Sequence, residues 1–196
     1  MKKSQVYVLA FAFALAVGLA GCAANEQAAG DAATTAPAVT ESTAATSSAV
    51  TGNAATPARG TAIGDLAPEF QLTQTDGAPV SDDSLRGRPA VVVFWTAWCP
   101  SCKEEAPHIN ELAAKYEPQG VRVLGINIQD SEARTAGGIR EFGIKYPVAR
   151  DADAKVAKLY KVQGTPTVMF MDKDGVIRYT GNELPKDYAA QLDKLL

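Results

Sequence analysis

The sequence predicts an α/β fold, with a central mixed sheet and helices on both faces. Three features predict it: a buried strand at residues 90–95, a helix at residues 100–116 and a second buried strand at residues 121–128. Two strands joined by a helix form a parallel pair with a right-handed connection. A strand hairpin at residues 167–179 adds antiparallel pairing, which makes the sheet mixed.

The first elements lie in PVSDDSLRG, residues 79–87, which reads as a strand end followed by a short helical turn. Ser81 is the expected N-cap, because its hydroxyl can accept a backbone N–H of the first turn, and Gly87 is the expected C-terminal stop. The run AVVVFW, residues 90–95, is apolar throughout and rich in β-branched residues. Such a run is typical of a central strand buried on both faces.

The helix at residues 100–116 opens with Pro100, which suits a first helical turn. Four apolar residues follow at helical spacing: Ile109, Leu112, Ala113 and Tyr116. Pro118 and Gly120 are expected to end the helix. After the strand VRVLGINI, a weaker helix is expected at residues 131–142, where two glycines dilute the helical pattern.

The last part of the chain is expected to hold a short helix near residues 156–160 and then the hairpin TVMFM-DKDG-VIRY. A closing helix is expected to begin at Pro185, as its first helical residue, and to reach Leu196.

Length and composition restrict the possible functions. The chain of 196 residues is long enough for one domain with a hydrophobic core. Its formal net charge is −3 and no dense basic run follows the first few residues, so nucleic-acid binding has no electrostatic support. The three cysteines are too few for a disulfide scaffold, so the role of each must be argued separately.

Residues 1–22 have the pattern of an export signal, with a positive start, an apolar stretch too short for a comfortable membrane span, and the ending LAGC. This ending resembles a bacterial lipobox, in which the cysteine becomes the first residue of the mature chain and carries a lipid. The resemblance implies that Cys22 anchors the protein in a bilayer, with its folded part facing the periplasm or the cell exterior. The alternative is an ordinary signal peptide in which Cys22 is incidental.

Residues 23–60 are predicted to be a disordered linker, because they are almost wholly Ala, Thr, Ser, Gly, Pro and Asn. Such a segment cannot bury enough apolar surface to offset the entropy lost on ordering. Its expected role is to hold the domain at residues 61–196 clear of a membrane.

Cys99 and Cys102 form a CxxC pair where a strand ends and a helix begins. The first amides of a helix lack internal partners and the helix dipole favours negative charge there, so a thiol at this position ionises more readily. Cys102 lies on the neighbouring turn, within bridging reach. We expect Cys99 to be exposed and to attack first, and Cys102 to be more buried and to resolve the mixed disulfide. No cofactor is expected beyond this redox-active disulfide.

A structural or metal-binding role for the pair is less well supported. A structural disulfide that closes only four residues would constrain the unfolded chain very little. A zinc site needs about four ligands, and the chain offers one CxxC and a single histidine, His108.

FWTAWCPSC at residues 94–102, Pro107 and GTPT at residues 164–167 together resemble the thioredoxin fold. More narrowly, residues 61–196 resemble the membrane-anchored, extracytoplasmic thiol-disulfide oxidoreductases of the TlpA/ResA type, which the segments APEF, RGR and DKDG also fit. The resemblance implies a thioredoxin-like fold and thiol-disulfide exchange.

The position of Glu105 distinguishes the TlpA/ResA-like proteins from thioredoxin itself. TlpA/ResA-like proteins place a glutamate three residues after the second cysteine, where Glu105 stands, whereas thioredoxin has a buried aspartate at the position of Val93. The resemblance implies that Glu105 accepts a proton for Cys102. Helix geometry allows direct contact with Cys102, and a water-mediated one with Cys99, which lies about 9 Å away along the axis. The alternative is an ordinary solvated carboxylate, like Glu104.

Four residues near the pair are candidate substrate contacts: Trp98, Pro100, Thr165 and Pro166. Pro166 resembles the cis-proline that packs against the cysteine pair in this family, the alternative being a plain proline at the start of a strand. Thr165 would then offer its backbone to an extended partner peptide. Trp98 either shields the sulfurs and contacts substrate or serves packing.

These features predict a lipid-anchored, extracytoplasmic thiol-disulfide oxidoreductase. The resemblance implies exported cysteine-containing proteins such as apocytochrome c as substrates. A membrane electron-donor protein is expected to renew the reduced state, because reducing thiols are scarce outside the cytoplasm. Two rival functions stay open: a thiol peroxidase of the peroxiredoxin type, and a metallochaperone-type copper-binding protein, whose relatives use CxxxC and a distant histidine.

Overall fold

The computed structural model describes residues 57–196. The predicted signal peptide with Cys22, and residues 23–56 of the predicted linker, lie outside the described residues. Ordered contacts begin inside the last residues of that linker, where the Gly60 amide donates to the Leu66 carbonyl and the Leu66 amide donates to the Ala58 carbonyl. Among the described residues, no helix combines the length and apolarity needed to cross a bilayer.

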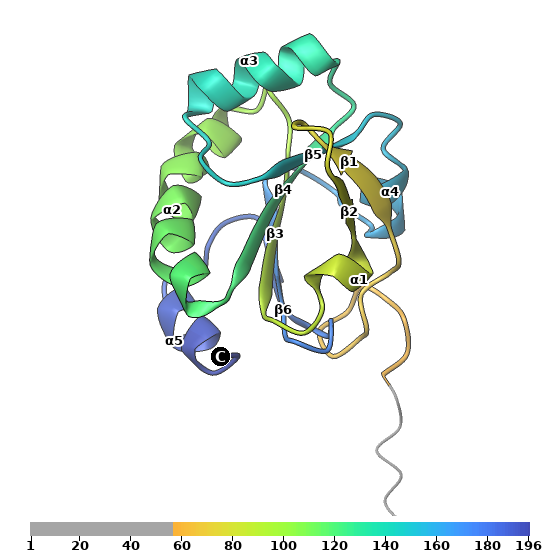
Figure 1. Ribbon diagram of the computed structural model, residues 1–196, viewed down its shortest axis with the longest axis vertical. Coiled ribbons are helices and arrows are strands. Elements are labelled where there is room, and N and C mark those ends of the chain that lie inside the picture. Colours follow the sequence, from red (N-terminus) through yellow and green to blue (C-terminus); the bar gives the residue numbers. More distant parts are fainter. Residues whose placement is uncertain (1–56) are drawn as a thin grey trace, which may run out of the picture. The chain divides into compact units, whose positions relative to one another are not determined.

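The described part contains one mixed sheet of seven strands, in the order β2-β1-β5-β4-β3-β6-β7. Strands β1 to β6 are labelled in Figure 1. The strands are β1 (Gln71–Gln74), β2 (Pro79–Ser81), β3 (Ala90–Trp95), β4 (Arg122–Ile128), β5 (Val148–Asp151), β6 (Thr167–Met171) and β7 (Ile177–Gly181). The helices are α1 (Asp82–Leu85), α2 (Pro100–Tyr116), α3 (Glu132–Phe142), α4 (Lys155–Leu159) and α5 (Tyr188–Asp193), with a 3₁₀ turn, η1 (Glu117–Gln119), after α2. The predicted mixed sheet is confirmed, since β3 pairs with β4 in parallel and with β6 in antiparallel fashion.

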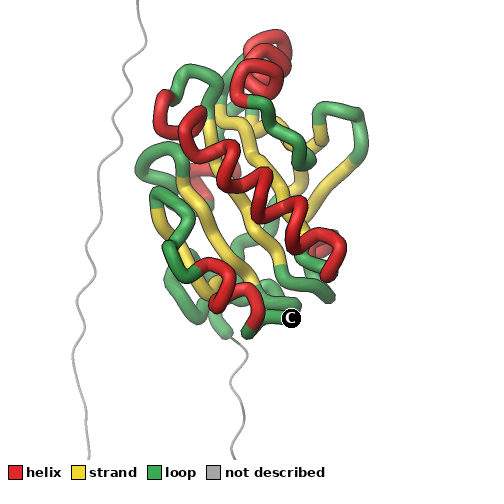
Figure 2. Tube along the Cα trace, turned by 90° about the vertical axis from the view of Figure 1, so that its left-hand side faces the viewer, coloured by secondary structure: helices red, strands yellow, loops and turns green. Residues whose placement is uncertain are grey.

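Strand β3 lies at the centre of the sheet and is buried along its whole length, as its apolar sequence predicts. Its alternate side chains enter two cores. Val92 and Phe94 belong to the core beneath α1 and α4. Val91 and Val93 belong to the core beneath α2 and α5. Figure 2 views the second face, where α2 runs diagonally across the strands. Helices therefore cover both faces, and the end of β3 is held from two sides where it leads into α2.

Several local signals in the sequence are confirmed. The Ser81 hydroxyl accepts the Ser84 amide and caps α1, and Gly87 has a positive φ of 81° just after the helix. Helix α2 has the predicted bounds, and Gly120 ends the segment after it with a φ of 103°, a conformation that glycine adopts without a steric cost. The helix expected at residues 131–142 is present as α3, but it begins one residue later, at Glu132, because Ser131 is its N-cap and accepts the Arg134 amide.

Strands β1 and β5 were not expected from the sequence. Strand β1, QLTQ, carries a single apolar residue, and its side chains are all exposed or half-buried. Strand β5, VARD, is four residues long and too short to show a period. Both are strands because of their partners: β5 pairs in parallel with β4, and β1 pairs with β2 and β5.

The prediction for the closing helix is wrong in its bounds. Pro185 does not begin the helix; its carbonyl accepts the Tyr188 amide in a turn, and α5 runs only from Tyr188 to Asp193. Proline suits a turn as well as a first helical position, so its presence alone did not fix where the helix begins.

Leu112, on the buried face of α2, should contribute strongly to stability. It is fully buried beneath the helix, so Leu112→Ala should lower the free energy of unfolding by about 2–5 kcal/mol. Leu159→Ala is the matched control, because Leu159 is 48% exposed, and it should cost less than about 1 kcal/mol. Urea unfolding of both variants measures the difference; equal losses would show that the core beneath α2 is not as described.

Candidate active site

Cys99 is the N-cap residue of α2, directly after the loop that leaves β3. Its backbone is extended, with φ −90° and ψ 113°, and Pro100 occupies the first helical position as predicted. The Cys99 sulfur accepts the Cys102 amide at 3.1 Å. This amide belongs to the first turn of the helix and has no helical acceptor, so it stabilises negative charge on the sulfur when Cys99 is a thiolate.

The loop before β6 forms the other side of the site. The Thr165–Pro166 peptide bond is cis, as the family resemblance implies, and the Cys99 thiol donates to the Thr165 carbonyl at 3.2 Å. Cys99 and Thr165 are 66 positions apart in the chain. The structure therefore brings together the cysteine pair, Thr165 and Pro166, four of the residues singled out in the sequence.

The prediction that Cys99 is exposed is wrong. Cys99 is 6% exposed and Cys102 is 5% exposed, and both are free thiols. Both pack in a small cluster with Trp95, Ala106, Phe142 and Val148. Cys99 is buried because the Thr165 segment, distant in the chain, lies against its sulfur. Exposure thus does not distinguish the two cysteines, and their electrostatic surroundings must do so.

Burial and a hydrogen bond with Cys99 raise the pKa of the Cys102 thiol to about 12. Cys102 consequently remains a protonated thiol at neutral pH, and it needs a base to become the thiolate that resolves a mixed disulfide. Cys99, by contrast, holds the position at the positive end of the helix with an amide directed at its sulfur. The surroundings of the two sulfurs therefore differ: one accepts a helix amide, and the other is a buried, protonated thiol.

This asymmetry predicts selective alkylation. In the reduced protein at pH 7, iodoacetamide should modify Cys99 and leave Cys102 unmodified, because only thiolates react and the Cys102 pKa lies far above that pH. Modification of Cys102 should appear only as the pH rises toward 12. Fragmentation mass spectrometry of the peptide that contains both residues locates the label, and preferential labelling of Cys102 at pH 7 would contradict the assignment.

Glu105 is largely buried, with 13% of its side chain exposed, so it is not an ordinary solvated carboxylate. One carboxylate oxygen accepts the Leu184 amide at 2.8 Å, and the other lies 3.6 Å from His108 Nδ1. Among residues 57–196, no hydrogen bond joins Glu105 directly to either sulfur, which corrects the expected contact with Cys102. Glu105 and Cys102 instead line the same small cavity.

That cavity has a volume of about 10 Å³, close to the space that one water molecule requires. Its wall combines Cys102 and Glu105 with Pro166 and with apolar and aromatic side chains: Val93, Trp95, Ala106, Ile109, Phe142, Ile144 and Tyr146. Burial and the nearby Cys102 and Glu105 raise the pKa of Tyr146, so its hydroxyl keeps its proton. A single water in this space would connect the resolving thiol to the carboxylate.

A protein-family model described as the AhpC/TSA family matches residues 63–180, which is more than half of the chain. The chain belongs to the AhpC/TSA family. Two curated relatives are thiol-disulfide oxidoreductases. The thiol-disulfide oxidoreductase ResA of Bacillus cereus is 30% identical over 135 residues, which cover 68% of this chain and 78% of the relative. ResA of Geobacillus kaustophilus is 31% identical over 136 residues, with the same coverage.

A solved structure of a disulfide oxidoreductase is also similar to this chain. A secreted disulfide oxidoreductase of Mycobacterium tuberculosis, homologous to E. coli DsbE, is 29% identical and has a TM-score of 0.56, with 65% of this chain and 96% of that one covered. The thioredoxin-like fold is thus confirmed. This AhpC/TSA family member is a ResA/DsbE-like thiol-disulfide oxidoreductase with the CxxC pair Cys99–Cys102.

The structure also places four other residues that the sequence of this family member drew attention to, which are two tryptophans, a valine and a histidine. Trp98, next to Cys99 in the chain, is 69% exposed, so it can contact a partner. Trp95 is in the core, as expected, and Val93 is a buried apolar residue that lines the small cavity. His108 is exposed, and its Nδ1 atom lies 3.6 Å from a Glu105 carboxylate oxygen.

The sequence reasoning did not select two residues of the site, Tyr146 and Asp130. Tyr146 has no local motif and reaches the cavity through the segment before β5. Asp130 accepts the amide of Ala97, two residues before Cys99. Its signal was present, since polar residues that follow a buried parallel strand often serve a site at the carboxyl edge of the sheet.

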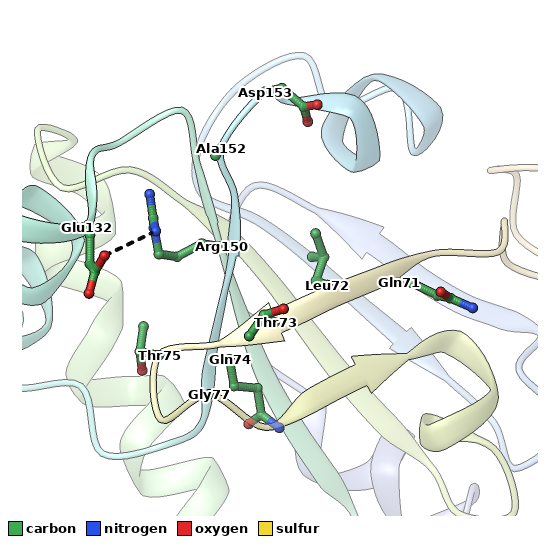
Figure 3. A pocket seen from close by; sticks show the side chains of 10 residues that line it. All are labelled: Gln71, Leu72, Thr73, Gln74, Thr75, Gly77, Glu132, Arg150, Ala152 and Asp153. Atoms are coloured by element: carbon green, nitrogen blue, oxygen red, sulfur yellow. Dashed lines mark ion pairs between the residues drawn. The ribbon is translucent and has the colours of Figure 1, made fainter.

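A larger pocket away from the cysteine pair lacks this chemistry. A pocket of about 520 Å³ lies between β1, Arg150 and the start of α3, where Arg150 pairs with Glu132 (Figure 3). Its wall contains neither cysteine and is mostly polar. Among residues 57–196, no group of three or more His, Cys, Asp or Glu residues is arranged to hold a metal ion.

Proposed function

We propose that this family member reduces disulfides in exported proteins, apocytochrome c among them, from a lipid anchor at Cys22. In this proposal its domain faces the periplasm or the cell exterior. The observation that supports the proposed exchange is the asymmetry of the pair: the Cys99 sulfur accepts a helix amide, while burial raises the pKa of Cys102 to about 12. Such a dithiol holds one sulfur ready to attack and a second in reserve.

In the proposed reaction the Cys99 thiolate attacks one sulfur of a substrate disulfide. A Cys99–substrate disulfide forms, and the other substrate sulfur leaves as a thiolate and takes up a proton. Cys102 then loses its proton and attacks the Cys99 sulfur, which closes the Cys99–Cys102 disulfide and releases the second substrate thiol. Two electrons pass to the substrate, and an exported or membrane-bound dithiol donor must return them.

Glu105 and the cis-proline loop have the supporting roles in this proposal. Glu105 receives the Cys102 proton through the small cavity that both residues line. The substrate segment lies against the Thr165–Pro166 backbone, with Pro100 and the exposed Trp98 beside it. Both sulfurs are nearly buried and the Thr165 carbonyl lies 3.2 Å from the Cys99 sulfur, so in this proposal the substrate disulfide displaces that contact when it reaches Cys99.

Disulfide reduction by the purified protein tests the proposal. With a dithiol donor present, it should reduce an oxidised CxxCH peptide of apocytochrome c and insulin disulfides, and it should consume hydrogen peroxide no faster than the donor alone. Peroxide consumption that exceeds disulfide reduction would replace the proposal with the thiol-peroxidase function.

The proposed anchor is tested separately. In cells supplied with an alkyne-labelled fatty acid, the full chain should acquire the label and Cys22→Ser should not. An unlabelled full chain would contradict lipidation and leave an ordinary export signal.

A further inference from the structure

A buried carboxylate from outside the CxxC helix holds the loop that leads into Cys99. Asp130 follows β4, and 1% of its side chain is exposed. Its Oδ2 atom accepts the Ala97 amide at 2.7 Å and the Asn127 side-chain amide at 3.0 Å. Ala97 lies beyond the end of β3, where no strand can supply an acceptor for its amide. A partly buried amide without an acceptor would be costly, so the carboxylate has a definite task.

The carboxylate is itself fixed in place. The Thr135 hydroxyl of α3 donates to Asn127 Oδ1 at 2.7 Å, which orients the Asn127 amide toward Asp130. Asn127 stands directly across from Trp95 in the β3–β4 pairing. A chain of hydrogen bonds thus runs from α3 through Asn127 and Asp130 to the loop before the cysteines.

The loop in turn determines where the Cys99 sulfur lies. The Cys99 amide donates to the Thr96 carbonyl at 3.3 Å, so residues 96–99 form one turn, and Ala97 lies inside it. From this turn the Cys99 sulfur meets the Cys102 amide at 3.1 Å and the Thr165 carbonyl at 3.2 Å. A displacement of the turn would move the sulfur away from both groups.

We propose that Asp130 is a positioning residue for thiol-disulfide exchange, which holds the Thr96–Cys99 turn through the Ala97 amide and so keeps the Cys99 sulfur at the N-terminus of α2. The inference rests on the proposed role of Cys99 as the attacking sulfur. Asp130 touches neither sulfur and acts only through the loop.

The matched control is Asp151, another buried aspartate that accepts two backbone amides. Its side chain is directed at α4, where it accepts the Val156 and Ala157 amides, and not at the cysteine loop. Loss of either aspartate should lower the melting temperature. Only loss of Asp130 should change the reactivity of Cys99.

The experiment measures the rate at which iodoacetamide alkylates Cys99 in the reduced full chain, together with kcat and KM for disulfide reduction. Asp130→Ala should slow alkylation and lower kcat by about ten- to a hundredfold, the usual effect of a reactive group displaced by about 1 Å, and leave KM nearly unchanged. Asp130→Asn should restore both rates to within about threefold, because its side-chain oxygen can accept the same two N–H groups. Asp151→Ala should leave both rates at the wild-type values.

Wild-type alkylation and kcat in Asp130→Ala, with a melting temperature lowered as in Asp151→Ala, would overturn the proposal. If Asp130→Ala does not fold, hydrogen exchange of the Ala97 amide in the wild-type protein decides: protection supports the proposal and free exchange overturns it. Alkylation needs no protein substrate, so a failure here leaves the proposed function intact. A failure of the proposed function would already appear as absent disulfide reduction by the wild-type protein.

Discussion

Cys99→Ser is expected to abolish disulfide reduction, with the rate falling to that of the uncatalysed exchange. The Cys99 sulfur is the one that combines a position at the N-cap of α2 with a hydrogen bond from a helix amide. A serine hydroxyl has almost the same shape, but it is not ionised at neutral pH and cannot form a disulfide. Insulin reduction with a dithiol donor measures the loss.

Cys102 cannot replace Cys99 in that variant. Burial and the neighbouring sulfur raise its pKa to about 12, so it is almost entirely a protonated thiol at pH 7. The melting temperature of Cys99→Ser should stay close to the wild-type value, which separates lost chemistry from lost folding. Substantial activity in Cys99→Ser would mean that Cys102 is the attacking sulfur.

Glu105→Gln should slow disulfide exchange at neutral pH by about a hundredfold, within the usual range for a lost general base. The side-chain oxygen of the glutamine can still accept the hydrogen bond from the Leu184 amide, which Glu105 accepts at 2.8 Å, so the fold should persist. What is lost is the carboxylate that we propose takes the Cys102 proton; both residues line the small cavity. The expected defect lies in resolution, so stopped-flow measurements should show the mixed disulfide of Cys99 persisting longer than in the wild type.

Glu104→Gln is the matched control for this variant. Glu104 is the adjacent carboxylate on α2 and is exposed, outside the cavity that Glu105 and Cys102 line. Its substitution should leave the rate within about twofold, since surface changes away from such contacts have small effects. Equal rates for the two variants and the wild type would remove Glu105 from the mechanism.

The local parts of this site were predictable from the sequence. Pro100 and the cysteine before it mark the start of α2, and the β-branched run before them marks the central strand, because caps, prolines and apolar runs act over a few residues. The family resemblance supplied the cis bond before Pro166 and drew attention to Glu105.

The parts that were missed depend on contacts between distant segments. Cys99 is buried because Thr165, 66 positions away, lies against its sulfur. Glu105 is held by the Leu184 amide, 79 positions away, and the Asp130–Ala97 contact spans 33 positions. The polar strand β1 has no apolar pattern of its own, and it becomes a strand because β2 and β5 pair with it.

The central claim is that Cys99 attacks and Cys102 resolves, and trapping the intermediate tests it most directly. Cys102→Ser should accumulate a mixed disulfide between Cys99 and an oxidised CxxCH peptide, visible in non-reducing mass spectrometry as one peptide added at Cys99. Cys99→Ser should accumulate none. A peptide trapped on Cys102 in Cys99→Ser, together with no adduct in Cys102→Ser, would contradict the account.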